Sequence, residues 1–331
     1  MMKAMVYHRY GGPEVLELAE LPPPKTHVDS VLVRVRAAAL NPADLELQAG
    51  ALDGAVDTYF PVIPGWDIAG VVERPGLATP EFAPGDEVIG YIRGDVQRAH
   101  GGMAELVSTA ARNLVRKPRA LSFAEAAGLP LAGLTAYQAV AHALDVQPGE
   151  TLLVHGAAGA VGSLAVQIAL SRGARVIGTA SAHDHGYVRN LGAEPVTYGE
   201  GVADRVRELA PGGADVVLDT VGGVLTATAT VARPGARIAS IAEIGTPGVT
   251  TVFCRMSHDD LTALTELAEA GQLRVRLGAT YPLEHASDAQ RALAAGGTHG
   301  KVVIEITKAG INRGASQLGH AGPDQLSRAD G

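Results

Sequence analysis

A glycine-rich turn between a strand pattern and a helix pattern constrains the fold of this chain more than any other feature. The apolar run Leu153-Val154 leads into a G-x-x-G-x-x-G turn at residues 156–162, and a helical pattern then continues to Arg172. Glycine allows a sharp turn and a close backbone approach to a pyrophosphate, while the helix N-terminus offers amide donors and a favourable dipole. Such turns also occur for packing alone, but the flanking strand and helix favour a dinucleotide-binding turn.

The patterns on either side of this turn divide the chain. From 151 to 241 strand and helix patterns alternate, which indicates a parallel sheet with helices on both faces. Up to about Leu121 short strands are separated by Pro/Gly turns, and Val31, Val33 and Val35 share one strand face. We therefore expect an α/β protein with a β-rich domain at 1–121, a doubly wound parallel sheet at 122–259, a further helix–strand segment at 260–306 and a disordered tail at 307–331.

Local patterns define some element boundaries. Ser122 and Glu125 have the spacing of a capping box, which predicts a helix that begins there. The other elements that matter below are a helix over Leu134–Leu144, a strand near Val275–Leu277 and a terminal strand over Val249–Phe253. An edge strand leaves unpaired amides, so we expect a homodimer to form near Thr250–Arg255, unless the chain's own tail covers that edge.

Charge and cysteine content exclude several classes of function. The chain has 27 Lys and Arg against 35 Asp and Glu, a net charge of −8, and no basic stripe, which argues against nucleic acid as a partner. It has no run of 18 apolar residues for a membrane span and no signal-peptide core at its N-terminus, so we expect a cytoplasmic protein. Its single cysteine, Cys254, excludes an internal disulfide and any zinc site that needs several thiolates.

The end of the next predicted strand bears on the choice of dinucleotide. NAD-binding turns usually have an Asp or Glu about 20 residues further on, which binds the ribose hydroxyls. Here residues 177–183 contain no carboxylate. Ser181 can donate a hydrogen bond to a 2′-phosphate and His183 can add charge, so the sequence favours NADPH. Alternatively, Ser181 caps a helix and His183 is simply solvated.

Several motifs together resemble one known family. They are Tyr10-Gly-Gly-Pro-Glu-Val-Leu16, Asn41-Pro-Ala-Asp44, Pro64-Gly-Trp-Asp-Ile-Ala-Gly-Val-Val72, Gly85-Asp-Glu-Val88, Leu134-Thr-Ala-Tyr137, the glycine turn and Gly300-Lys-Val-Val303. In combination the chain resembles the zinc-lacking branch of the medium-chain dehydrogenase/reductase superfamily, specifically its NADPH-dependent quinone oxidoreductases. The resemblance implies a GroES-like N-terminal domain, a Rossmann domain, a last segment that returns to the first domain, and a cleft that holds cofactor and substrate.

The same resemblance implies roles for individual residues at the cofactor site. Thr135 would contact the nicotinamide side of NADPH, and Ser181 would bind the 2′-phosphate, with His183 where relatives often carry Arg or Lys. The remaining residues implied are Gly159, Ala160 and Val161 at the pyrophosphate, Tyr198 beside the 2′-phosphate, Ile241 and Phe253 at the nicotinamide and Lys301 near the cleft. Ile241 and Phe253 would also serve a hydrophobic core, and Tyr198 would also serve as a strand end.

A reaction follows from what the site lacks. Zinc-dependent relatives place a Cys near Asn41 and a His-Glu pair at Trp66-Asp67, so we expect no catalytic metal here. Without a metal, the chemistry suits hydride transfer from NADPH to a small-molecule quinone or activated C=C. We expect Asn41 to orient the reactants and Tyr59 to donate a hydrogen bond, while Asp44 and Asp67 brace loops.

Two alternatives stay open. An enoyl reductase of the polyketide or fatty-acid type fits the same fold, although fatty-acid members tend to place a tyrosine after the glycine at Gly50, where this chain has Ala51. A protein that binds NADPH without turnover also fits, because fold alone does not decide function.

Overall fold

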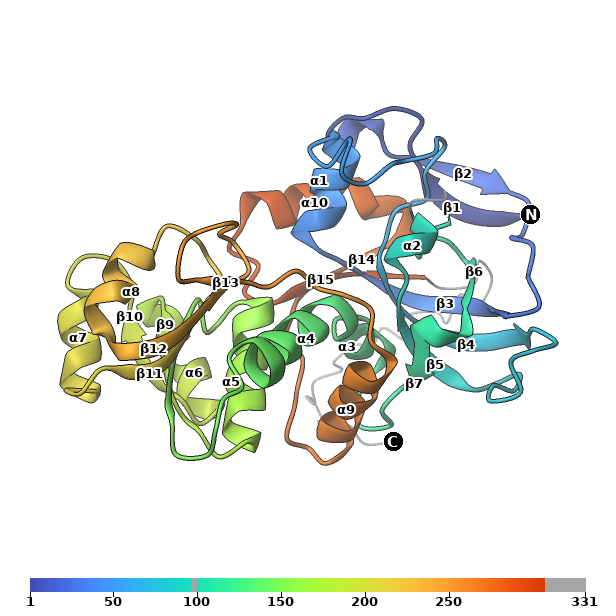
Figure 1. Ribbon diagram of the computed structural model, residues 1–331. Coiled ribbons are helices and arrows are strands. Elements are labelled where there is room, and N and C mark those ends of the chain that lie inside the picture. Colours follow the sequence, from blue (N-terminus) through green and yellow to red (C-terminus); the bar gives the residue numbers. More distant parts are fainter. Residues whose placement is uncertain (97–99, 307–331) are drawn as a thin grey trace, which may run out of the picture.

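The computed structural model describes residues 1–96 and 100–306, which form two large sheets and one small one. A mostly antiparallel sheet, built largely from the N-terminal part, and a parallel sheet, built from the middle of the chain, lie at opposite ends of the molecule (Figure 1). The expected α/β fold class, with a GroES-like domain and a doubly wound parallel sheet, is confirmed.

The antiparallel sheet contains strands from both ends of the chain. Its order is β14-β15-β3-β4-β5-β7, β6 also pairs with β3, and β1 and β2 form a separate hairpin-like pair. The long strand β3 alternates as expected, because Val31, Val33 and Val35 are buried on one face while Arg36 is exposed. The strands are β1 (Met2–Val6), β2 (Glu17–Leu21), β3 (Ser30–Leu40), β4 (Asp67–Pro75), β5 (Glu87–Tyr91), β6 (Leu106–Ala110), β7 (Leu114–Arg116), β14 (Leu277–Pro282) and β15 (Lys301–Glu305).

The six strands of the other sheet are all parallel, in the order β10-β9-β8-β11-β12-β13. Helices cover the sheet, and Leu152, Leu153 and Val154 of β8 are consequently all fully buried. Because every strand runs the same way, the carboxyl ends meet at one edge, where ligands bind in open α/β sheets. The strands are β8 (Thr151–His155), β9 (Arg175–Ala180), β10 (Glu194–Thr197), β11 (Ala214–Asp219), β12 (Ala232–Ser240) and β13 (Thr250–Thr251).

Helices α3, α4 and α9 lie between the two large sheets. α3 packs on β3 and β4, α4 packs on β4, β5, α5 and α9, and α9 also reaches β7 (Figure 1). The helices are α1 (Pro42–Ala49), α2 (Arg93–Val96), α3 (Phe123–Ala127), α4 (Pro130–Tyr137), α5 (Ala160–Ser171), α6 (His185–Asn190), α7 (Val202–Leu209), α8 (Leu225–Val231), α9 (His258–Glu269) and α10 (Ala286–Ala295), with a π-helical stretch η3 (Gln138–Ala143) and short 3₁₀ turns η1 (Pro13–Val15), η2 (Ala111–Asn113), η4 (Ala182–Asp184) and η5 (Leu283–His285).

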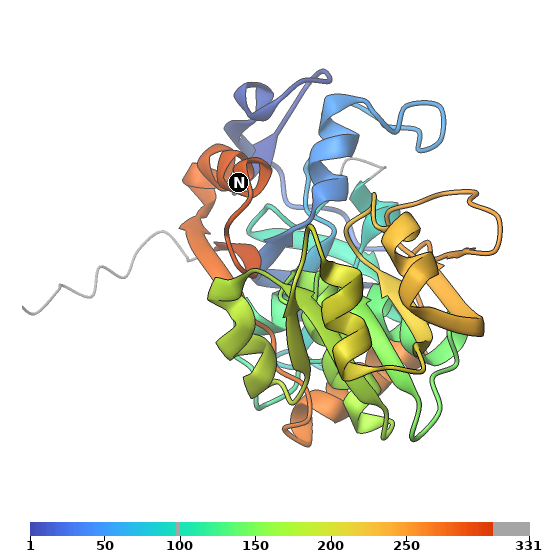
Figure 2. The ribbon, with the colours of Figure 1, turned by 90° about the vertical axis from the view of Figure 1, so that its left-hand side faces the viewer.

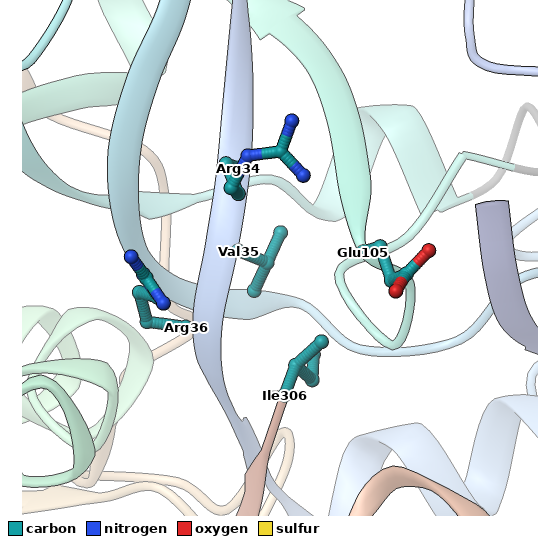
Figure 3. A pocket seen from close by; sticks show the side chains of 5 residues that line it. All are labelled: Arg34, Val35, Arg36, Glu105 and Ile306. Carbon is teal, nitrogen blue, oxygen red and sulfur yellow. The ribbon is translucent and has the colours of Figure 1, made fainter. Parts of the chain in front are cut away.

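The last segment returns to the N-terminal domain. β15 pairs antiparallel with β3, which places Val302 opposite Leu40, and α10 lies beside α1 (Figures 1 and 2). Near the end of this segment Ile306 lines a small pocket with residues of β3 (Figure 3). Its volume of about 10 Å³ admits a single water at most, so it is not a substrate site.

Some predicted elements differ in the structure. The capping box is confirmed, with Ser122 Oγ accepting from the Glu125 amide at 3.2 Å. The predicted strand over 249–253 was too long, because its partner β12 ends at Ser240 and leaves only Thr250 and Thr251 as a regular strand. The predicted helix over 134–144 starts earlier, at Pro130, and its last part is π-helical; the strand near 275–277 starts later, at Leu277. The tail expected at 307–331 lies outside the described residues.

The glycines of the 156–162 turn are required by close backbone packing. Gly156 adopts a φ of +78°, a conformation that residues with a Cβ rarely take. A Cβ at Gly162 would lie 2.1 Å from the carbonyl oxygen of Gly156, so only glycine lets α5 begin this close to the turn. The turn is thereby compact, and its backbone can approach a ligand closely on the solvent side.

Replacing Gly162 should therefore destabilise the fold. We expect Gly162→Ala to lower the free energy of unfolding by about 1–3 kcal/mol, the usual cost of overpacking. Gly212→Ala is the matched control, because nothing lies within 4 Å of its Cβ position. Urea denaturation of both variants measures the difference. Equal stabilities of the two variants would contradict the packing argument.

Candidate active site

The carboxyl edge of the parallel sheet brings the predicted dinucleotide residues together. Gly159 caps α5, and Ala160 and Val161 form its first turn, directly after β8. Ser181 follows β9 and Tyr198 follows β10, and the Tyr198 amide donates to the Ala180 carbonyl at 3.4 Å. These five residues thus lie on neighbouring strand ends around the glycine turn. The arrangement fits a dinucleotide, because the turn offers the free amides of a twelve-residue helix at the carboxyl ends of parallel strands.

The neighbouring strand β9 fixes the position of the turn. The Gly156 amide donates to Thr179 Oγ1 at 3.0 Å, and the Ala157 amide donates to the Thr179 carbonyl at 2.9 Å. These two hydrogen bonds to Thr179 leave the turn little freedom. A turn held in this way loses less entropy when it binds a ligand.

A buried carboxylate lies next to Ser181, and the sequence argument missed it. Ser181 Oγ donates to Asp184 Oδ2 at 2.9 Å and accepts from the Asp184 amide at 3.3 Å, so the capping role considered for Ser181 is present. Burial alone would raise the pKa of Asp184, but hydrogen bonds from Arg276 and Ser181 outweigh it, and the pKa lies below its usual value. His183 is 77% exposed, as the solvated alternative expected.

The other end of the edge is built from the loops after β11 and β12. Asp219 Oδ1 accepts from the amides of Val221 and Gly222 at 2.9 Å, and Asp219 Oδ2 accepts from Ser240 Oγ at 2.8 Å. Ile241 follows directly, and its amide donates to the Asp219 carbonyl at 3.0 Å. The loop that carries Ile241 is therefore held by a buried polar pair.

Thr135, Phe253 and Cys254 come from elements that connect the two domains. Thr135 on α4 is buried and donates to the Leu131 carbonyl at 2.7 Å. Phe253 is largely exposed, and the Arg93 guanidinium lies 5.4 Å from the centre of its ring. Arg93 also donates to the Cys254 carbonyl at 3.1 Å, and burial raises the pKa of the Cys254 thiol to about 11. The N-terminal domain is thus tied to the segment after β13.

A buried polar network lies where three distant segments meet. Asn41 Nδ2 donates to Asp67 Oδ2 at 3.0 Å, and Lys301 Nζ donates to Asn41 Oδ1 and lies 3.6 Å from Asp67 Oδ2. Asp67 Oδ1 accepts from the Leu131 amide at the start of α4, at 2.9 Å. Asp44 Oδ2 accepts a hydrogen bond from the backbone amide of Asn41 at 2.8 Å. Asp44 and Asp67 therefore brace loops, as expected.

In this network, two of the predicted site residues bind other protein groups. We expected Asn41 to orient the reactants and Lys301 to lie near the cofactor, yet both side chains are buried and bound to protein groups. Because the polar atoms of a buried side chain must be satisfied, their immediate role in the structure is to hold the junction. Tyr59, the expected donor, lies 66% exposed in the loop before β4.

Burial controls the charge of the network. Removal from water, together with the negative charge of Asp67, raises the pKa of Asp44 to about 7. Burial also raises the pKa of Asp67 and lowers that of Lys301, although these two groups partly stabilise each other's charge. Asp44 Oδ1 has no hydrogen-bond partner, and a carboxylate oxygen without a donor adds to the cost of ionising this group.

Three buried donors among the described residues were not found from the sequence: the Tyr7 hydroxyl, Trp66 Nε1 and the Tyr91 hydroxyl have no hydrogen-bond partner. The ring centres of Trp66 and Tyr91 lie 6.3 Å apart. Arg93 lies over the Tyr91 ring at 5.6 Å. No sequence signal marked them, because whether a donor is satisfied depends on packing that only the fold creates.

The residues do not form a zinc site at the positions where zinc-dependent relatives bind the metal. The side-chain amide of Asn41 is hydrogen-bonded to Lys301 and Asp67, and the Trp66 indole offers a donor but no metal-binding atom. Within residues 1–96 and 100–306, the cluster of His, Cys, Asp or Glu that could hold a metal is His183, Asp184 and His299, at the cofactor edge. No helix in that part of the chain is long and apolar enough to cross a membrane.

Comparison with known proteins agrees with this arrangement. The family model of the alcohol dehydrogenase GroES-like domain matches residues 27–119, and that of zinc-binding dehydrogenases matches residues 191–304. The NADPH-dependent alkenal/one oxidoreductase of Arabidopsis thaliana chloroplasts is 34% identical over 92% of this chain and 79% of its own length. The chain belongs to the medium-chain dehydrogenase/reductase superfamily.

Other relatives place it among the oxidoreductases of that superfamily. Human quinone oxidoreductase is 29% identical over 92% of this chain and 98% of its own length. The crystal structure of an NAD-dependent alcohol dehydrogenase, 34% identical, superposes with a TM-score of 0.85 over 92% of this chain and all of that one. The resemblance drawn from the sequence motifs is confirmed, and the protein is an oxidoreductase of a family that binds a nicotinamide cofactor.

The raised pKa of Asp44 leads to a stability prediction. In the unfolded chain this carboxyl group has a pKa of about 4. Because folding raises that pKa, folding binds a proton, and the free energy of unfolding of the wild type should fall as pH rises from about 4 to about 7. Asp44→Asn keeps an oxygen for the Asn41 amide without a charge. Relative to the wild type, we expect this variant to gain on the order of 2 kcal/mol between pH 5 and pH 8.

Thermal unfolding of both proteins at the two pH values measures this difference. Asp67→Asn is the informative comparison, because it removes the partner of buried Lys301 and should destabilise the protein at both pH values. A stability difference between Asp44→Asn and the wild type that does not change with pH would show that Asp44 ionises normally.

Proposed function

We propose that this oxidoreductase is an NADPH-dependent, zinc-independent reductase of quinones or enones. The names of the Arabidopsis and human relatives support this substrate class. The observation that carries the proposal is the glycine turn, which is held in place at the carboxyl edge of the parallel sheet. The loops of Ile241 and Phe253 lie at the other end of that edge. When bound, the nicotinamide supplies the hydride.

The protein's own part is to position the substrate and stabilise charge on its oxygen. Addition of hydride to an enone or quinone leaves negative charge on oxygen, which needs a hydrogen-bond donor but no metal. Tyr59 stays the donor proposed from the sequence, and Trp66 Nε1 and the Tyr91 hydroxyl are two further donors with free hydrogens. We propose that Asn41 acts through the junction with Asp67 and that Thr135 lies at the nicotinamide.

The preference for NADPH rests on this chain's own residues, because a similar solved structure is an NAD-dependent enzyme. Ser181 and His183 lie in the loop after β9. Tyr198 follows the neighbouring strand β10 and is 61% exposed. An imidazole and two hydroxyls suit a 2′-phosphate. We also propose a cytoplasmic location, which the single partly buried thiol of Cys254 suits.

A substrate panel tests the proposed reaction. With NADPH in excess, we expect purified protein to reduce a simple quinone or a short enone, seen as loss of NADPH absorbance, at a rate unchanged by a chelator. A crotonyl thioester tests the enoyl reductase alternative, and ethanol with NADP⁺ is the control for metal-dependent chemistry. NADPH binding without turnover of any acceptor would favour the non-catalytic alternative, and activity restored by zinc after chelation would disprove the metal-free mechanism.

We further propose a homodimer through the edge of the parallel sheet. β13 pairs with β12 on one side, and Ile244 and Phe253 beside it are strongly exposed. Light scattering at micromolar concentration should give about twice the chain mass of 33.9 kDa. Ile244→Lys should shift the protein toward monomer, whereas Leu77→Lys, in an equally exposed loop of the other domain, should not. A monomeric wild type would contradict the proposal.

A further inference from the structure

The position of Asp184 conflicts with a simple account of NADPH binding. Its carboxylate lies four residues after the end of β9, in the turn η4, and is hydrogen-bonded to Ser181, which is proposed to face the 2′-phosphate. A carboxylate near this position repels a phosphate and accepts hydrogen bonds from ribose hydroxyls, which favours NADH. Something must therefore neutralise Asp184 if NADPH is the cofactor.

The C-terminal segment provides that neutralisation. Arg276, just before β14, donates to Asp184 Oδ1 at 2.9 Å, and His299, just before β15, lies with Nδ1 3.0 Å from Asp184 Oδ2. With Ser181 also bound to Oδ2, both oxygens are occupied, and only 6% of the Asp184 side chain is exposed. The Arg276 guanidinium is itself held, because it stacks on the Tyr187 ring at 4.2 Å.

The solvent side of this cluster is formed by imidazoles. The rings of His183 and His299 lie 5.1 Å apart and are tilted by 37°, and both are substantially exposed. Because the charges of Asp184 and Arg276 cancel, the cluster presents hydrogen-bonding rings that become cationic when protonated. A divalent metal at the same three ligand atoms would have to compete with Arg276 for Asp184, so we assign the cluster to cofactor recognition.

We propose that Arg276 and His299 set the preference for NADPH by masking the carboxylate of Asp184. The inference rests on the proposed function, because it assumes that the edge binds a dinucleotide. It assigns cofactor specificity to residues 92 and 115 positions beyond Asp184 in the chain, in the segment that returns to the N-terminal domain. Arg276 acts through Asp184 and is a specificity-determining residue.

Direct binding measurements test the mask without any substrate. Arg276→Met keeps an unbranched chain over Tyr187 but removes the charge, so the negative charge of Asp184 would no longer be balanced and its Oδ1 would lose the Arg276 hydrogen bond, while Ser181 and His299 still hold Oδ2. By fluorescence titration we expect the preference for NADPH over NADH, the ratio of their Kd values, to fall by about tenfold or more. Arg274→Met is the matched control, because this exposed side chain makes no hydrogen bond or ion pair among the described residues, and the ratio should not change.

A double variant separates masking from general damage. Asp184→Asn together with Arg276→Met removes both the charge and its mask, so the preference for NADPH should return toward the wild-type value. If Arg276→Met weakens both dinucleotides equally, or leaves the ratio unchanged, the inference is wrong. If Arg276→Met does not fold, the double variant alone decides, because loss of its NADPH preference would also overturn the mask.

Binding of 2′,5′-ADP and 5′-AMP distinguishes this failure from failure of the proposed function. A wild type that binds both nucleotides equally has no 2′-phosphate site, and both the NADPH assignment and the mask would be wrong. A wild type that prefers 2′,5′-ADP while Arg276→Met keeps that preference would leave the proposed function intact and overturn the mask alone.

Discussion

The buried contact of Lys301 with Asn41 and Asp67 is the interaction on which the two-domain arrangement depends. Lys301 belongs to β15, Asn41 and Asp67 to the N-terminal domain, and Asp67 also holds the first amide of α4. An ammonium without solvent must be paired, so the last strand cannot leave this position without leaving a bare charge behind. α4 carries Thr135, and the junction therefore also positions a residue of the proposed cofactor site.

The return of the C-terminal segment thus serves two distant places in the structure. Lys301 fixes the junction with the N-terminal domain, and Arg276 and His299, from the same segment, hold Asp184 at the sheet edge. A single stretch of chain pairs with β3 in the antiparallel sheet and contacts Asp184 beside the proposed dinucleotide site. Any movement of this segment would alter both places together, which couples the fold to cofactor recognition.

Features that depend on residues close together in the sequence could be predicted from it, and features that depend on residues far apart in the sequence could not. The capping box at Ser122 and the glycine turn before α5 depend on neighbours within a few positions, and both were found correctly. The mask of Asp184 depends on partners far along the chain, so a pattern search around β9 could not reveal it. The edge strand around Thr250 was overestimated for a related reason, because its length is set by β12 and not by its own β-branched residues.

Burial of Asp44 is costly for stability but suits the proposed chemistry. Burial raises the pKa of Asp44 to about 7 and also raises that of Asp67, while the Lys301 side chain lies beside Asp67, so a proton on Asp44 reduces the negative charge of the network. Trp66 Nε1 and the Tyr91 hydroxyl, the two further donors proposed for the substrate oxygen, belong to the same domain. Since like charges in a water-poor site repel strongly, a protonated Asp44 would favour the reduced substrate in the zinc-independent reaction proposed above.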